Sequence, residues 1–159
     1  MYHYILQIRQ EPHKEEDWAA EEDFINRPDL IPIADHVKTV YDRDSAIRHF
    51  GQWFTGHHMG TFSGDSFTLA PDARIHYFEG RFSEFKKKLK ALDTVTEPLY
   101  IHDHDYVENL LSDLVSSFCN CRSCYVMESD DTPIPFDKFI RTAVPDMPYY
   151  IGTVLEYHC

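Results

Sequence analysis

The sequence contains no long apolar run, and this absence limits where the protein works. No hydrophobic stretch among the 159 residues approaches the roughly 20 residues that span a bilayer. Met1 is followed by Tyr-His-Tyr-Ile, whereas a secretory signal has a basic segment and then a hydrophobic stretch. We therefore expect a cytoplasmic protein that does not associate with a membrane.

Glycine is scarce, and the motifs built on it are missing. The chain has six glycines, none of them in a Gly-x-Ser-x-Gly nucleophile elbow or a phosphate-binding loop. The glycine-rich first turn typical of a doubly wound α/β sheet is absent as well. Because no catalytic motif is present, the sequence favours a binding or regulatory protein that acts through protein–protein contacts over an enzyme.

Basic residues are few beside acidic ones, 15 against 27, and the net charge is -12. This charge repels phosphate backbones and anionic membrane surfaces, so we expect no direct binding to nucleic acid. We expect a basic protein partner instead, or, as a variant, mimicry of DNA against a DNA-binding enzyme. The densest acidic block, the candidate partner-binding site, consists of Glu15, Glu16, Asp17, Glu21, Glu22 and Asp23. The alternative is that this block is the solvated face of a short helix over residues 14–25.

The chain has four cysteines and one Cys-x-x-Cys motif. Cys121 and Cys124 have the spacing with which two thiolates bind one tetrahedral zinc, and Cys119 lies two residues before them. A closed structural site needs four ligands, so a further residue must complete the set. The alternative function is therefore a zinc- or iron-binding protein, which includes a metal-dependent enzyme. Its candidate ligands are Cys119, Cys121, Cys124, His102, His104, His158 and Cys159. In the competing interpretation the cysteines pack as ordinary thiols and no cofactor is bound.

The two histidines at 102 and 104 have two interpretations. In an extended segment, residues one apart share a face, so His102 and His104 have a geometry used by metal sites. Alternatively, Asp103 and Asp105 cap the helix that follows, and the histidines lie exposed in the joining loop.

Apolar periodicity predicts the fold class. Alternation over residues 2–8 predicts a strand, and we also expect strands over residues 74–78 and 99–102. Steps of three and four predict helices over residues 82–92 and 105–118, and the broad apolar stripe of the second predicts the central buried helix. With 43% hydrophobic residues, we expect one α+β domain over residues 1–159, with a mixed or antiparallel sheet of about five strands and helices packed mainly on one face.

Overall fold

The computed structural model describes residues 3–14, 17–24, 36–118, 124–128 and 132–158. The chain divides into two compact units. We name Met1–Tyr77 with Cys121–Cys159 the sheet unit and Phe78–Asn120 the helical unit. The helical unit is thus inserted between two parts of the sheet unit. The single domain predicted over residues 1–159 stays a prediction.

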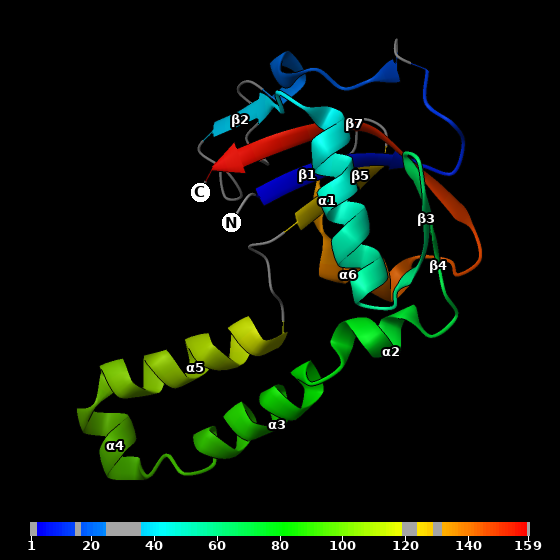
Figure 1. The fold of residues 1–159 in the computed structure, drawn as a ribbon. Helices are drawn as coiled ribbons and strands as arrows, with labels where there is room; N and C mark the ends of the chain where they lie inside the picture. Colours follow the sequence, from blue (N-terminus) through cyan, green and yellow to red (C-terminus); the bar gives the residue numbers. More distant parts are fainter. Residues whose placement is uncertain (1–2, 15–16, 25–35, 119–123, 129–131, 159) are drawn as a thin grey trace. The chain divides into compact units, whose positions relative to one another are not determined.

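The described residues of the sheet unit form a seven-stranded sheet with β1 and β7 at its centre (Figure 1). Its order is β3-β4-β7-β1-β5-β6, and β2 pairs with β7 beside this path. The pairs are antiparallel except β1 with β5, which is parallel. The strands are β1 (His3–Arg9), β2 (His36–Thr39), β3 (Gly60–Ser63), β4 (Ser66–Leu69), β5 (Cys124–Glu128), β6 (Ile134–Pro135) and β7 (Pro148–His158). The predicted α+β class with a mixed sheet is confirmed.

Helices α1 (Arg43–Gly56) and α6 (Phe136–Thr142) cover one face of this sheet with an aromatic core. The ring of Phe50 in α1 lies 5.8 Å from that of Phe67 in β4 and 5.7 Å from that of Phe136 in α6. Edge-on ring pairs at such distances add to the stabilisation that burial gives. The Asp42 carboxylate accepts a hydrogen bond from the Ser45 backbone N–H at 2.9 Å and thereby starts α1 as its N-cap.

On the opposite face of the sheet, the described covering residues form a 3-10 helix and no α-helix. Phe24, at the end of the 3-10 helix Glu21–Phe24, joins Ile5, Tyr125 and Leu155 in a buried cluster. Strand β1 is therefore buried on both faces, and Gln7 is as inaccessible as Leu6. The helix predicted over residues 14–25 is wrong, because the described part of this segment contains 3-10 turns and no α-helix.

The helical unit contains α3 (Arg81–Leu92), α4 (Glu97–His102) and α5 (His104–Phe118). Helices α3 and α5 run antiparallel, because Phe85 contacts Phe118 whereas Lys88, later in α3, pairs with Asp113, earlier in α5. The helices predicted over residues 82–92 and 105–118 are confirmed. The strands predicted over residues 74–78 and 99–102 are wrong: both segments are helical, in α2 (Ala73–Phe78) and α4.

Candidate functional site

The predicted metal ligands fall into three groups. Cys119, Cys121 and Cys159 lie outside the described residues. Cys124 begins β5 and His158 ends β7, both in the sheet unit, whereas His102 and His104 belong to the helical unit. Within the sheet, β1 separates β5 from β7. The metal site therefore stays a prediction. Elemental analysis of the untagged protein with reduced thiols tests it, and less than about a tenth of an equivalent of zinc or iron would exclude it.

Cys124 has the chemistry of a protected thiol. The residue is only partly covered, but its sulfur lies away from water, and this burial raises the pKa of the thiol to about 12. The sulfur donates a hydrogen bond to its neighbour's carbonyl, Tyr125 O, at 3.6 Å. Because a metal ligand or a nucleophile must be the thiolate, Cys124 is poorly prepared for either role.

His102 and His104 lie exposed at the junction of α4 and α5. His104 Nδ1 is 3.7 Å from an Asp105 oxygen and 3.5 Å from a Glu108 oxygen. Among the described residues this is the only group of three side chains with metal-ligand chemistry close together, and all three are exposed to water. The helix is capped by Asp103, whose carboxylate accepts from the Tyr106 N–H at 3.2 Å. The exposed arrangement alone assigns no metal to these residues.

The described members of the acidic block contact their own segment and the sheet. Asp17 forms an ion pair with Arg9 at 3.1 Å. Glu21 accepts from the Thr39 N–H of β2, and Asp23 accepts from the Ala20 N–H that precedes the 3-10 helix. Glu22 is exposed, and Glu15 and Glu16 lie outside the described residues. A basic partner at this block stays a prediction. The structure adds a local role for these carboxylates, because each of the three stabilises the fold of its segment.

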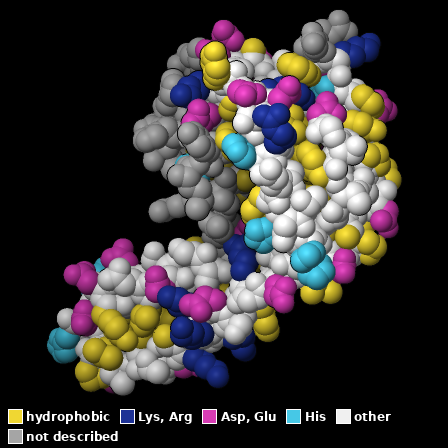
Figure 2. All heavy atoms as spheres, in the orientation of Figure 1, with side chains coloured by type: hydrophobic (Ala, Val, Ile, Leu, Met, Phe, Trp, Pro, Cys, Tyr) yellow, Lys and Arg dark blue, Asp and Glu magenta, His cyan; other side chains and the backbone are white. Residues whose placement is uncertain are grey.

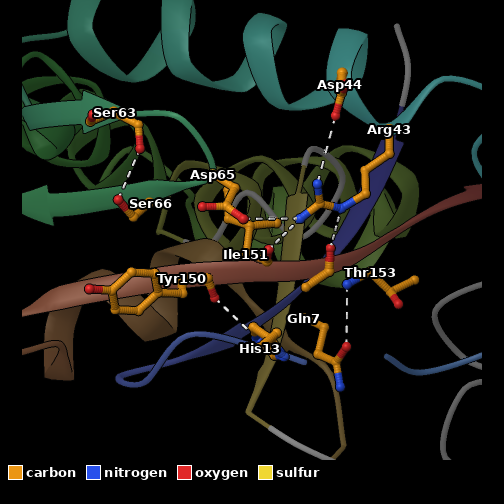
Figure 3. Close-up of polar contacts among 11 residues, drawn as sticks. Gln7, His13, Arg43, Asp44, Ser63, Asp65, Ser66, Tyr150, Ile151 and Thr153 are labelled. Carbon is orange, nitrogen blue, oxygen red and sulfur yellow. Dashed lines mark hydrogen bonds and ion pairs between the residues drawn. The ribbon is translucent and has the colours of Figure 1, made fainter. Parts of the chain in front are cut away.

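A network of polar side chains lies where β7 bulges against β1 (Figure 3). Leu6 pairs with Val154 and Ile8 with Ile151, so β7 contains one residue more than β1 across this step. A bulge disrupts the ladder locally and leaves backbone groups to be satisfied otherwise. The Arg43 guanidinium satisfies two of these backbone carbonyls, donating to Ile151 O at 2.5 Å and to Gly152 O at 2.6 Å.

Gln7 and His13 complete this network from the opposite side of β7 (Figure 3). The Gln7 amide accepts from the N–H groups of Ala19 and Thr153 and donates to Asp17 O. His13 Nε2 lies 3.1 Å from Tyr150 O, in the geometry of a donor to that carbonyl. Burial, and then the charge of Arg9, lower the pKa of His13. These side chains bond backbone groups, so the network stabilises the bulge and the segment that covers it.

The helical unit exposes the apolar side chains that the sequence assigns to a core. No described residue of α3, α4 or α5 is buried. Phe82 is 69% exposed, Val115 65% and Leu111 49%. Figure 2 shows hydrophobic side chains on the surface at the α4 end of the unit and acidic and basic side chains meeting between α3 and α5. The predicted buried position of residues 105–118 is therefore wrong, although the stripe itself is present.

One face of the α3–α5 hairpin combines apolar residues from both helices. The ion pair of Lys88 with Asp113, at 2.6 Å, lies on one side of the hairpin. Leu111 and Val115 are each two residues from Asp113 and so lie on the other side, because helical residues two apart do not share a face. At about 100° per residue around α3, Phe85, which contacts α5, lies between Lys88 and the pair Phe82 and Leu89, so this pair is on the second side. We call Phe82, Leu89, Leu111 and Val115 the apolar face.

Charged residues flank the apolar face differently on the two helices. On α3, Lys86 is four residues from Phe82 and three from Leu89, and Lys90 follows it by one turn. On α5, Glu108 is three residues before Leu111 and seven before Val115. The face therefore has a basic border along α3 and an acidic border along α5. The sequence contains both patterns, but only the pairing of α3 with α5 places them around one surface.

No helix among the described residues is long and apolar enough to cross a membrane. Comparison with models of known protein families, with curated proteins and with solved structures finds no match.

Proposed function

We propose that the chain is a binding or regulatory protein that acts through protein–protein contacts and that the apolar face of the helical unit is its contact surface. The observation that carries this proposal is a helical hairpin with no buried residue among those described, whose large apolar side chains face water. Monomeric proteins rarely leave such residues together on a surface without a partner.

The energetics of the hairpin support a binding role. Isolated helices of 12 and 15 residues, the lengths of α3 and α5, are marginal in water. Burying a Phe, Leu or Val side chain contributes about 1.5 to 3 kcal/mol relative to leaving it exposed. A partner that covers the apolar face therefore stabilises the hairpin by several such contributions.

The basic partner and cytoplasmic location that the composition predicts stay part of the proposal. The basic partner rests on the acidic excess of the chain. Between Phe78 and Phe118 the chain has five basic and eight acidic residues, which is about the same acidic excess per residue as in the rest of the sequence. The acidic block, which a basic partner would contact, belongs to the sheet unit, whereas the apolar face has borders of both signs and suits a partner surface of mixed charge.

Site-specific photo-crosslinking in living cells tests the proposal. A photoreactive phenylalanine analogue replaces Leu111 in the full chain, and the control chain carries it at Asn109, an exposed position two residues away on another side of α5. We expect protein adducts from position 111 well above those from position 109. Equal adducts at both positions, or none at 111, would contradict a contact surface on the apolar face.

A further inference from the structure

The charges at the border of the apolar face indicate its partner. We infer that this face binds a second copy of the chain, so that two hairpins form a four-helix bundle with α3 of one copy over α5 of the other. This inference rests on the proposed function, because it names the partner of the same surface. It goes beyond that function in fixing the symmetry of the complex and the residues that meet.

Self-association requires a surface that is complementary to itself. In a two-fold symmetric dimer the same patch of both copies is in contact, so a patch of one charge sign repels its twin. The apolar face avoids this, because its basic border, Lys86 and Lys90, lies on α3 and its acidic border, Glu108, lies on α5. Placing α3 over the other copy's α5 brings opposite charges together on both sides of the interface.

The same charges select one of two symmetric arrangements. A two-fold axis parallel to the helices places α3 over the second copy's α5, in antiparallel orientation. An axis across the helices places α3 over α3 and α5 over α5, which brings the lysines together and the carboxylates together. Like charges opposed in an interface are unfavourable. The parallel axis is therefore the arrangement that this chain supports.

The internal register of the hairpin identifies a pair across the interface. Lys88 lies level with Asp113 in the hairpin. Because the helices are antiparallel, Lys90 lies level with residue 111, and Glu108 is only three residues, or about 5 Å, farther along α5. With the two-fold axis parallel to the helices, the second copy keeps this level. Lys90 of one copy then lies beside Glu108 of the other, and symmetry makes the pair twice.

The size of the face predicts a reversible dimer. Helices of 12 and 15 residues are about 18 and about 22 Å long and pack about 10 Å apart, so the paired face measures roughly 400 Å². Standard interfaces bury about 800 Å² on each partner, and smaller ones are typical of transient complexes. We therefore expect association in the micromolar range, with sensitivity to salt.

Sedimentation equilibrium of the full chain tests the dimer, from about 1 to about 200 µM and at about 0.05 and about 0.5 M salt. We expect a monomer–dimer equilibrium that weakens at high salt. The double variant Leu111→Asp with Val115→Asp should be monomeric throughout, while Asn109→Asp, which adds one charge on another side of α5, should dimerise like the parent. Circular dichroism shows whether each variant keeps its helices. A parent chain that is monomeric at every concentration overturns the inference.

Charge reversal tests the arrangement. Lys90→Glu and Glu108→Lys should each weaken dimerisation about ten-fold at low salt, because each opposes like charges twice. Combining them should restore the parent affinity within about two-fold. A combined variant as weak as the single ones overturns the pairing of α3 with α5.

The crosslinking experiment separates this inference from the proposed function. Adducts of twice the chain's mass from position 111 support both. Adducts with another protein, from a chain that stays monomeric in the centrifuge, overturn the dimer and leave the proposed function standing. A monomer without adducts contradicts both.

Discussion

Gly152 is the residue on which the polar network at the bulge depends most directly. A Cβ at this position would lie 2.7 Å from His13 Nδ1 and 2.8 Å from Gln7 Oε1. Both atoms belong to side chains that hydrogen bonds hold in place, His13 to Tyr150 and Gln7 to three backbone groups. The glycine therefore provides the space in which the segment after β1 packs on β7.

We predict that Gly152→Ala destabilises the protein by about 1 to 3 kcal/mol, because the added methyl group must displace His13 or Gln7. Urea denaturation followed by circular dichroism measures the change. Gly56→Ala is the matched control: nothing lies within 4 Å of the added Cβ at the end of α1. It should leave the free energy of unfolding unchanged or raise it by up to about 1 kcal/mol. Equal losses in both variants would argue against a crowded site at Gly152.

Cys124 gives a pH dependence with a definite sign. The pKa of a free thiol is about 8.5, whereas burial raises that of Cys124 to about 12. Between these values the unfolded chain loses the proton and the folded chain keeps it, so stability falls as the pH rises. Below about pH 8 the thiol is protonated in both states and the difference disappears.

We therefore predict that the parent loses stability more steeply than Cys124→Ala between about pH 9 and about pH 10.5, by about 1 kcal/mol per pH unit. Urea denaturation of both proteins at each pH measures the difference, and the shared contributions of other titrating groups cancel. Parallel profiles would show that the thiol is not protected by burial. A native Cys124 that thiol reagents modify rapidly at pH 8 would lead to the same conclusion.

At the scale of elements, α5 shows how much of the structure an apolar periodicity predicts. Val107, Leu110, Leu111, Leu114 and Val115 predict an amphipathic helix, and α5 is one. The same stripe predicts burial at the centre of the fold, which is wrong. Phe118, at the end of the stripe, contacts Phe85 of α3. No described residue of α5 is buried, however. Periodicity identifies the apolar side of a helix, while the element that covers it is set by tertiary packing.

Hydrogen exchange should distinguish the helices of the hairpin from the central strands. In a solution of about 1 µM we predict that the amides of α3 and α5 exchange faster than those of β1 and β7, because local opening costs less where few apolar groups are buried. Exchange in α3 and α5 should slow as the concentration rises and dimers form. Mass spectrometry of peptic peptides measures both effects. Protection of α5 equal to that of β1 at every concentration would contradict an uncovered hairpin.

The misassigned elements share one physical cause. Residues 74–78 and 99–102 are short runs of apolar and aromatic residues, and periodicity alone does not distinguish a strand from one or two helical turns in so few residues. In the structure they are α2 and α4, and Arg74 of α2 donates to the carbonyls of Ile140 and Ala143. Contacts of this kind, far apart in sequence, decide the conformation of short segments.

At the scale of the whole molecule, the net charge and the placement of charged residues have separate effects. The chain has an excess of acid throughout, but between Phe78 and Phe118 all five basic residues lie in α3, whereas α5 has carboxylates and no Lys or Arg. A net charge governs solubility and long-range attraction, whereas sorted charges set the orientation of a specific complex. The sorted charges of the helical unit therefore support a defined dimer.

The sequence by itself determined the α+β class, the two long helices of the hairpin, their apolar stripe and the acidic excess, because these follow from local periodicity and composition. Only the tertiary structure decided that β1 is covered on both faces, that Gln7, His13 and Arg43 meet at the β7 bulge, and that α3 and α5 share an uncovered face. The physical reason is common to all three. Which elements lie together depends on contacts between distant parts of the chain, and no local pattern encodes them.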